Sequence, residues 1–224
     1  MNRTRQILLI GSLWTLVILS ACDHASPGSN KVTITPSSNN RPNSTHTTIQ
    51  PGMDKSPMDM AYYPIDYPKL KMSGNVSAPP VARVIYSRPQ KDNRVIFGDL
   101  VKYGSIWRLG ANEATELEFF QDVTINNQKV QKGRYVMYCI PQEKVWKLIF
   151  NNDLYTWGLK IDSTKDAYQF DIPVEKTRFP YEAFTMEFEE SEKPYMRLVL
   201  GWDSIRAALP IKYQEDRSRK SEDP

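Results

Sequence analysis

Apolar and polar residues alternate along most of the chain after residue 62. In one segment, Phe184, Met186 and Phe188 alternate with Thr and Glu. A period of two residues predicts strands with one face turned toward a core. This pattern, or a short apolar run, predicts strands at residues 81–87, 115–120, 123–125, 134–140, 145–151, 168–174, 184–189, 195–200 and 205–211.

Turn signals separate these segments, and no long amphipathic helix pattern competes with them. Asn126-Asn127 suits a tight hairpin turn, because Asn tolerates the positive φ that such turns need. Residues 97–104 are compatible with one short helical turn. The sequence therefore predicts an all-β fold, a single antiparallel β-sandwich or flattened barrel of about nine or ten short strands.

The first 21 residues have the pattern of a secretory signal. Arg3 and Arg5 precede a mostly apolar stretch at residues 7–19, which is too short to span a bilayer. The following Leu-Ser-Ala-Cys, ending at Cys22, resembles the bacterial lipobox, in which the cysteine is lipidated. We therefore expect Cys22 to be acylated, with several acyl chains giving a stable anchor in a membrane of the bacterial envelope, facing the periplasm or the surface. A plain secretory signal and an uncleaved membrane segment are the alternatives.

Composition divides the rest of the chain. Of the 37 residues from 23 to 59, 20 are Ser, Thr, Asn or Pro, and none is aromatic. Such a segment cannot bury enough apolar surface to fold, so residues 22–61 are predicted to be a disordered tether. All 12 Tyr and all eight Phe lie within residues 62–213, which we predict to be the folded domain, followed by a charged tail at 214–224.

Charge and histidine content exclude several functions. The formal net charge is only +3, which argues against a nucleic-acid partner. Both histidines, His24 and His46, lie in the predicted tether. The predicted domain therefore lacks Ser-His-Asp and Cys-His arrangements and His-ligated metals, so we predict no catalytic residue of these kinds, no metal and no cofactor. Cys139 is expected to be buried and inert.

One polar and aromatic cluster is the candidate ligand-binding site. Its members lie close together in a turn-rich stretch between predicted strands, where binding sites are often built: Tyr103, Trp107, Arg108, Asn112 and Glu113. In this hypothesis the cation would bind an anionic or hydroxyl-rich ligand, and Trp107 would stack on it. The competing and favoured interpretation is structural, with the polar groups satisfying turn amides and fixing the loop to the sheet.

Several segments of the predicted domain, read in order, resemble the DUF2911 family of exported bacterial proteins, many of them apparent lipoproteins. Residues 107–115 (Trp-Arg-Leu-Gly-Ala-Asn-Glu-Ala-Thr) are the most specific, and the others are 81–89, 94–98, 133–135, 140–141, 146, 149–151, 157–158 and 201–203. After Trp157-Gly158 the chain departs from the family pattern at residues 159–162. The resemblance implies fold and location only, since no function is established for the family.

These observations lead to three hypotheses. The first is a membrane-anchored envelope lipoprotein whose non-catalytic domain binds a small molecule, a glycan or an envelope protein. The second is a hydrolase of envelope or dietary polysaccharide that uses Asp99 and Glu113 as its acid–base pair. The third is a structural envelope component with an apolar patch for its partner.

Overall fold

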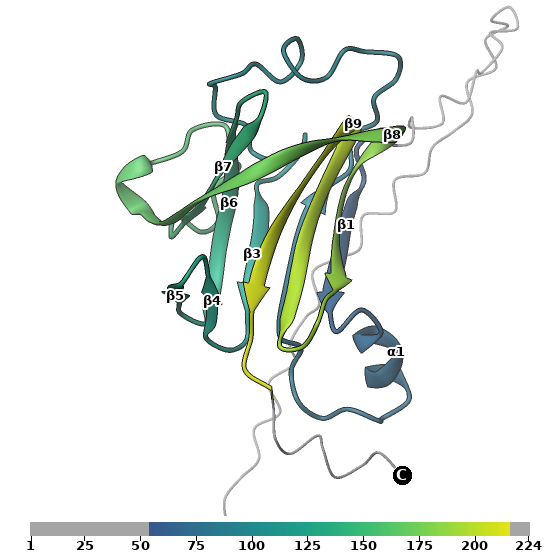
Figure 1. Cartoon of the computed structure of the whole chain (residues 1–224), viewed down its shortest axis with the longest axis vertical. Helices are drawn as coiled ribbons and strands as arrows, with labels where there is room; N and C mark the ends of the chain where they lie inside the picture. The colour runs from purple at the N-terminus through teal and green to yellow at the C-terminus, as the bar shows by residue number, and fades with distance from the viewer. Residues whose placement is uncertain (1–53, 216–224) are drawn as a thin grey trace, which may run out of the picture. The chain divides into compact units, whose positions relative to one another are not determined.

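A computed structural model describes residues 54–215, which form an antiparallel all-β domain (Figure 1). This confirms the predicted fold class. Nine strands follow the sheet order β1-β2-β3-β6-β7-β8-β9-β4-β5, and every pairing between them is antiparallel. The strands are β1 (Met58–Tyr63), β2 (Ala82–Ser87), β3 (Thr115–Phe119), β4 (Val123–Ile125), β5 (Gln128–Val130), β6 (Gly133–Pro141), β7 (Val145–Asn151), β8 (Asp166–Glu190) and β9 (Tyr195–Lys212).

The last two strands are much longer than predicted. β8 has 25 residues and β9 has 18, so the predicted pairs of short strands in these regions are continuous. The register of β8 against β9 shifts on both sides of Tyr181, and Asp203 has a φ of 51°. Bulges of this kind bend a strand and interrupt its inward and outward alternation, which made one long strand look like two.

The bend in β8 turns one sheet into a flattened barrel. The first part of β8 pairs with β7, and the later part pairs with β9 (Figure 1). The same later part meets the segment that follows β2, where the N–H of Phe184 donates to the carbonyl of Pro89 at 2.9 Å. On the other side, β9 reaches β4 through Thr124 and Lys212.

An aromatic cluster fills the barrel interior. Trp107, Trp146 and Trp202 are buried together with Phe184. Trp107 lies with its ring centre 5.7 Å from that of Trp146 and 5.9 Å from that of Trp202. Burying several large rings in edge and stacked contacts stabilises the domain and fixes which side chains face inward.

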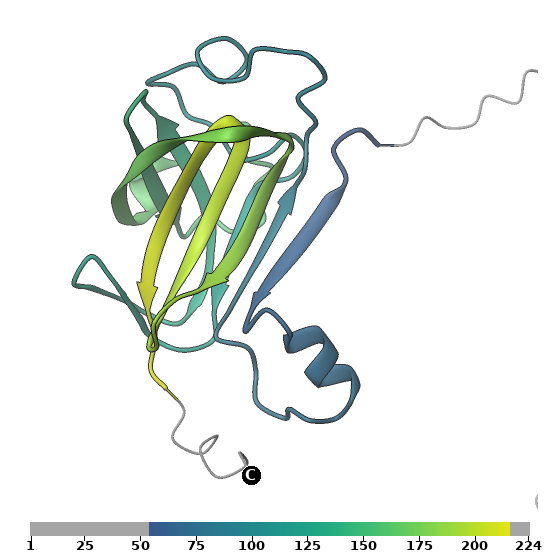
Figure 2. The same ribbon diagram turned by 45° about the vertical axis from the view of Figure 1, so that its right-hand side comes forward.

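The N-terminal boundary of the domain differs from the prediction. Met58–Ala61 lie in β1, so the last four residues assigned to the tether belong to the sheet, and residues 54–57 precede them (Figure 2). β1 also pairs with β2 along its whole length. The Ser- and Pro-rich composition of the preceding segment concealed this strand.

The helix of the domain also lies at a different place from the one that the sequence suggested. The segment 97–104 forms hydrogen-bonded turns, with the N–H of Val101 donating to Ile96, and contains no helix. The single α-helix of the described region, α1 (Tyr67–Met72), follows β1, and a short 3₁₀ turn lies at Ser163–Lys165. No helix within residues 54–215 has the length and apolarity to cross a membrane. The predicted signal peptide, Cys22 and most of the tether lie outside the described residues.

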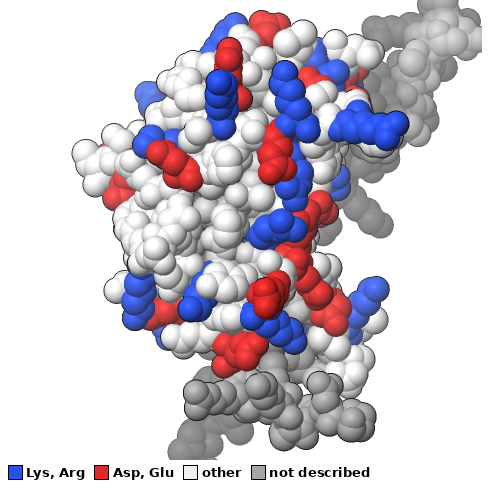
Figure 3. All heavy atoms as spheres, viewed as in Figure 1, with Lys and Arg blue, Asp and Glu red and all other residues white. Residues whose placement is uncertain are grey.

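Acidic and basic side chains are interspersed on the face shown in Figure 3. In the domain as a whole, ion pairs join side chains of neighbouring strands, including Arg206 with Glu189 at 2.8 Å and Lys147 with Asp171 at 3.3 Å. This face therefore presents no continuous cationic surface.

Candidate functional site

The predicted site, residues 103–113, is built largely into the fold. Trp107 is only 8% exposed and exchanges two backbone hydrogen bonds of 2.8 Å with Cys139 on β6. Its ring packs in the aromatic cluster, 5.0 Å from Phe184. Trp107 therefore has no exposed ring face with which to stack on a ligand. Its backbone is bonded to β6, and its ring is part of the core.

The polar members of the cluster are mostly engaged within the protein. Arg108 donates from Nη2 to the carbonyl of Ala111, and its buried Nε has no partner among the described residues. Asn112 donates from Nδ2 to Asp54 at 2.9 Å and to the carbonyl of Ser56 at 2.7 Å. These bonds close the loop and hold the segment before β1, as the structural interpretation expects.

A serine and a glycine explain the shape of this loop. Ser87 is fully buried, and its hydroxyl accepts hydrogen bonds from the N–H groups of Ala111 and Asn112 at 2.6 and 3.1 Å. A Cβ at Gly110 would lie 2.5 Å from that hydroxyl, and the φ of Gly110 is +153°. Only glycine allows the loop to approach β2 so closely. The packing of this loop against Ser87 therefore explains its Gly-Ala-Asn sequence.

Tyr103 and Glu113 remain accessible, but they lie apart from this network. Tyr103 is 38% exposed, and its ring lies against Gly98, whose hypothetical Cβ would be 3.3 Å away. Glu113 is exposed and has no hydrogen bond or ion pair to any described residue. Asp99, the proposed second carboxylate, lies 3.5 Å from Lys102. Neither Asp99 nor Glu113 lines the groove that contains Trp107 and Arg108, so that groove gives the acid–base pair no support.

A small apolar surface adjoins the loop. Trp157 is 55% exposed, and Ile106 and Leu159 are also exposed. Ile106 and Leu159 line a groove of about 320 Å³ whose other walls include Arg108 and Gly158. Gly158 has a positive φ and lies close to Ala114, so the loop that contains Gly158 lies against the end of the 107–113 loop. This surface is the part of the predicted region that remains open to a partner.

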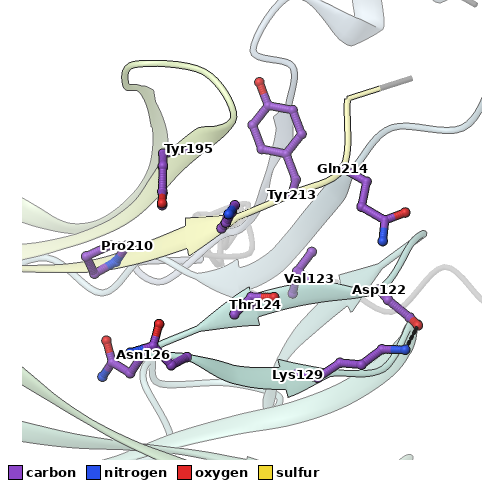
Figure 4. Close-up of a pocket in the computed structure, with 11 residues that line it drawn as sticks. Asp122, Val123, Thr124, Asn126, Lys129, Tyr195, Pro210, Tyr213 and Gln214 are labelled. Atoms are coloured by element: carbon purple, nitrogen blue, oxygen red, sulfur yellow. Dashed lines mark ion pairs between the residues drawn. The ribbon is translucent and has the colours of Figure 1, made fainter. Parts of the chain in front are cut away.

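A larger pocket lies elsewhere, between the β4–β5 hairpin and the end of β9 (Figure 4). We call it the hairpin pocket; its volume is about 640 Å³, within the range of small-molecule sites. It is lined by Asp122, Val123, Thr124, Asn126, Asn127, Lys129, Tyr195, Pro210, Lys212, Tyr213 and Gln214.

The hairpin sequence sets which of its side chains face the pocket. Asn126 and Asn127 have φ values of 47° and 63°, which form the predicted tight turn. Val123, Ile125 and Val130 are buried on the inner face. The alternating residues, among them Thr124 and Lys129, are thereby presented outward. The pattern predicted the turn, but nothing local indicated that β9 would lie opposite it.

Among the residues that the structure describes, the charges of the hairpin pocket leave one cation without an ion pair. Lys129 lies 2.8 Å from Asp122, and this hydrogen bond lowers the pKa of the Asp122 carboxyl and raises the pKa of Lys129. Lys212 forms no ion pair with a described residue and lies 5.8 Å from the ring centre of Tyr195. Two lysines against one aspartate give the described lining of the pocket a charge of +1.

Amides and aromatic rings complete the pocket. Asn126 and Asn127 are exposed and offer both donors and acceptors, and Tyr195 is partly exposed. The hydroxyl of Tyr213 lies 3.2 Å from that of Tyr63, which fixes the Tyr213 ring beside the pocket. Such a surface can hydrogen-bond hydroxyl groups, contact a ring face and attract an anion.

Metal and thiol chemistry find no support in the described region. Within residues 54–215 no three His, Cys, Asp or Glu side chains are grouped as they would be to hold a metal ion. Cys139 is fully buried as predicted, and burial raises the pKa of its thiol. A buried thiol held in its neutral form is a poor nucleophile.

Comparison with protein families gives one match. The model of DUF2911, a protein family of unknown function, matches residues 68–211, which is more than half of the chain. The chain belongs to the DUF2911 family. Neither the curated proteins nor the solved structures give a significant match. Membership in DUF2911 assigns no activity to the chain, because the family is one of unknown function.

Proposed function

We propose that this DUF2911 protein is a lipoprotein, anchored in a bacterial envelope membrane through acylated Cys22, whose β-domain binds a small anionic ligand rich in hydroxyl groups. An acidic sugar, free or within a glycan, is the simplest ligand of this chemistry. The ligand occupies the hairpin pocket. This differs from the sequence-based hypothesis, which located binding at Tyr103, Trp107, Arg108, Asn112 and Glu113.

The observation that carries the proposal is Lys212 beside the ring of Tyr195, without an ion pair to any residue from 54 to 215. In a pocket that also holds exposed amides, the ammonium group can pair with a carboxylate or sulfate while the ring contacts the sugar face. Among the described residues, Asp122 is the only carboxylate that lines the pocket, and its hydrogen bond with Lys129 lowers the pKa of the carboxyl. A glycosidase pair would need a second acid there, so the pocket favours binding over hydrolysis.

Membrane anchoring rests on the resemblance of residues 19–22 to the lipobox. Its test is labelling of the full chain in bacteria with an alkyne fatty acid, followed by membrane fractionation. The proposal predicts that the parent is labelled and sediments with membranes, and that Cys22→Ser is unlabelled and soluble. An unlabelled parent would contradict it.

Ligand binding is tested by calorimetry with oligogalacturonate and, as the matched neutral probe, its fully methyl-esterified form. The proposal predicts that the acid form binds and that Lys212→Ala weakens binding about tenfold or more, as does Tyr195→Ala. Lys144→Ala, at an exposed lysine outside the pocket, serves as the control and keeps the parent affinity. Equal binding of both probes, or no binding of either, would contradict the proposal.

A protein partner is the second candidate function, favoured by the exposed side chains of Ile106, Trp157 and Leu159. Apolar groups grouped beside one groove are typical of a contact surface. Cross-linking in intact cells through a photoreactive residue at position 157 tests it. A specific adduct that disappears in Leu159→Asp would support this function.

A further inference from the structure

β8 bends at one end of the barrel and exposes a short segment there. Residues 177–180 of β8 lie opposite residue 204 of β9 alone, where the register of the two strands shifts. Extra residues on one strand of a pair bulge away from the sheet. The hydroxyl of Thr177 donates to the carbonyl of Phe179 at 2.9 Å, which closes a tight local turn. We call residues 176–180 the β8 bend.

Several side chains of the β8 bend are open to solvent. Phe179 is 73% exposed, and Lys176 and Arg178 are also exposed. The guanidinium carbon of Arg178 lies 5.3 Å from the centre of the Phe179 ring. Tyr181, just after the bend, packs instead against Gly201, where a Cβ would lie 2.9 Å from the tyrosine ring. Core packing therefore explains Tyr181 but not the exposed phenylalanine.

The β8 bend carries positive charge. Neither Lys176 nor Arg178 forms an ion pair with a described residue. The acids that flank the bend are engaged within the protein. Glu175 lies 3.4 Å from Arg206, and Glu182 accepts a hydrogen bond of 2.9 Å from a backbone N–H of the neighbouring loop. The two cations are therefore available to an anionic partner beside an exposed aromatic ring.

A second segment of the same character lies beside the bend. The N–H of Lys91 donates to the carbonyl of Glu182 at 2.6 Å, which places residues 90–95 next to this part of β8. Arg94 is exposed and has no ion pair with a described residue, and Val95 is 62% exposed. The two segments thus present three such cations and two exposed apolar side chains, a combination typical of surfaces that bind membranes.

The chain enters the domain at the same end of the barrel. Lys55, the second described residue, lies 3.8 Å from Asp92 in the 90–95 segment. The start of β1 and the bends of β8 and β9 also lie at one end of the barrel in Figure 2. A lipid anchor at Cys22 is therefore joined to the domain at the end that carries these exposed cations and apolar side chains.

The hairpin pocket lies at the opposite end. Residue 204, which faces the β8 bend, is eight residues or more along β9 from Tyr195 and from Lys212, and both of these line the pocket. A strand of eight residues spans about 25 Å. In Figure 1 the β4–β5 hairpin accordingly lies toward the lower end, and the bends of β8 and β9 lie at the upper end.

We propose that the end of the barrel formed by the β8 bend and residues 90–95 docks on the anionic lipid surface of the membrane to which the protein is anchored. This proposal rests on the proposed anchoring through Cys22. Phe179 enters the headgroup region, where burial of apolar area stabilises the contact, and the three cations pair with headgroup phosphates. Docked in this way, the domain holds the hairpin pocket away from the bilayer and open to its ligand.

Fluorescence in lipid vesicles tests this orientation. The purified full-length protein carries an environment-sensitive dye on an azidophenylalanine at position 179 or, as the matched control, at the exposed Gln128 of the far hairpin. Each protein is incorporated in vesicles of phosphatidylcholine with phosphatidylglycerol, and in vesicles of phosphatidylcholine alone. We expect the dye emission to shift to the blue only at position 179 and only in the acidic vesicles.

Charge reversal tests the part that the cations play. In the chain labelled at position 179, Lys176→Glu and Arg178→Glu should each lower the ratio of docked to free domain about fivefold or more, since each removes a cation near the acidic surface. Lys69→Glu, at an exposed lysine of α1, is the matched control and keeps the parent shift. Circular dichroism establishes that all variants fold. A blue shift unaltered by both reversals in the bend would overturn the proposal.

Other results would also overturn it. Equal shifts at the two positions or in the two kinds of vesicle, or no shift at 179, would show that this end does not dock on anionic lipid. A shift that appears without vesicles and rises with protein concentration would identify a second copy of the chain as the occupant. A shift that needs added envelope protein would identify a protein partner. The dye reports on the surface whether or not Cys22 carries lipid, and fatty-acid labelling reports on the anchor alone, so this proposal and the proposed function can fail separately.

Discussion

The 107–113 loop and the hairpin pocket contain similar residues and use them differently. In the loop, Trp107 is buried, and Arg108 and Asn112 bond to carbonyl groups or carboxylates of the protein itself. In the hairpin pocket, Lys212 and Tyr195 remain accessible beside exposed amides. The difference teaches that a cluster of aromatic and polar residues indicates a binding site only when its polar groups are not already used by the fold.

The largest expected effect is on the loop side of this comparison. Trp107→Ala should lower the free energy of unfolding by about 3–5 kcal/mol, because it removes a large ring from the aromatic core. Trp157→Ala is the matched control at an exposed tryptophan and should change stability by less than about 1 kcal/mol. Urea unfolding followed by far-ultraviolet circular dichroism measures both. Similar losses in the two variants would contradict the loop's structural role.

The next effect concerns the contact between Gly110 and Ser87. Gly110→Ala should cost about 2–4 kcal/mol, because the new Cβ meets the Ser87 hydroxyl and the backbone stays at positive φ. Gly74→Ala shares the positive φ but has open space around it, so it should cost only about 1 kcal/mol. Thermal unfolding of the two variants separates steric clash from backbone strain. Equal melting temperatures would show that the close contact has no energetic consequence.

A pH effect of intermediate size is expected from the core. Burial raises the pKa of Cys139 in the folded state, so the native protein keeps a proton that the unfolded chain loses above the ordinary thiol pKa of about 8.5. The stabilisation is complete below that pH and declines as pH rises, by about 1.4 kcal/mol per unit from this group. In Cys139→Ala the fall between pH 8.5 and 10 should be shallower.

The control for this pH effect is Tyr155→Phe, at a highly exposed side chain, which should keep the parent slope. Urea midpoints at pH 7, 8.5 and 10 give the slopes. Buried Tyr86, whose pKa desolvation raises to about 12, adds to the decline only above the ordinary tyrosine pKa of about 10. A parent whose stability rises over this range would contradict the assignment.

The smallest expected effect on stability is on the pocket side of the comparison. Lys212→Ala and Tyr195→Ala alter exposed side chains at the end of the barrel, so each should change unfolding free energy by about 0.5 kcal/mol or less. Thermal unfolding measures this directly. A large loss in either variant would make Lys212 and Tyr195 structural residues, like those of the loop.

Much of the fold was predictable from the sequence because strand alternation is a local signal. β4 and β7 have the predicted bounds, and the Asn126-Asn127 turn was also predicted. The bends of β8 and β9 were not, since register shifts depend on the partner strand. β1 was missed because its pairing with β2 compensates for a weak local pattern.

The site was less predictable than the fold. The hairpin pocket joins residues 122–129 to Tyr195 and residues 210–214, which come together only when β9 crosses to β4. No pattern of residue spacing in the sequence predicts a contact between segments so far apart. For the 107–113 loop, the structural role of the polar residues was predicted. The buried hydroxyl of Ser87, which accepts hydrogen bonds from the loop amides, lies 20 residues upstream of Trp107. Its role was invisible without the fold.

The most direct test of the central claim is a two-dimensional ¹⁵N–¹H spectrum of the protein titrated with oligogalacturonate. The account predicts that the shifting amide signals belong to residues 122–130, Tyr195 and 210–214, and that they stop shifting in Lys212→Ala. Signals of residues 107–113 should stay fixed. Shifts centred on Arg108 and Glu113, with the hairpin unaffected, would contradict the account and return the binding site to the loop.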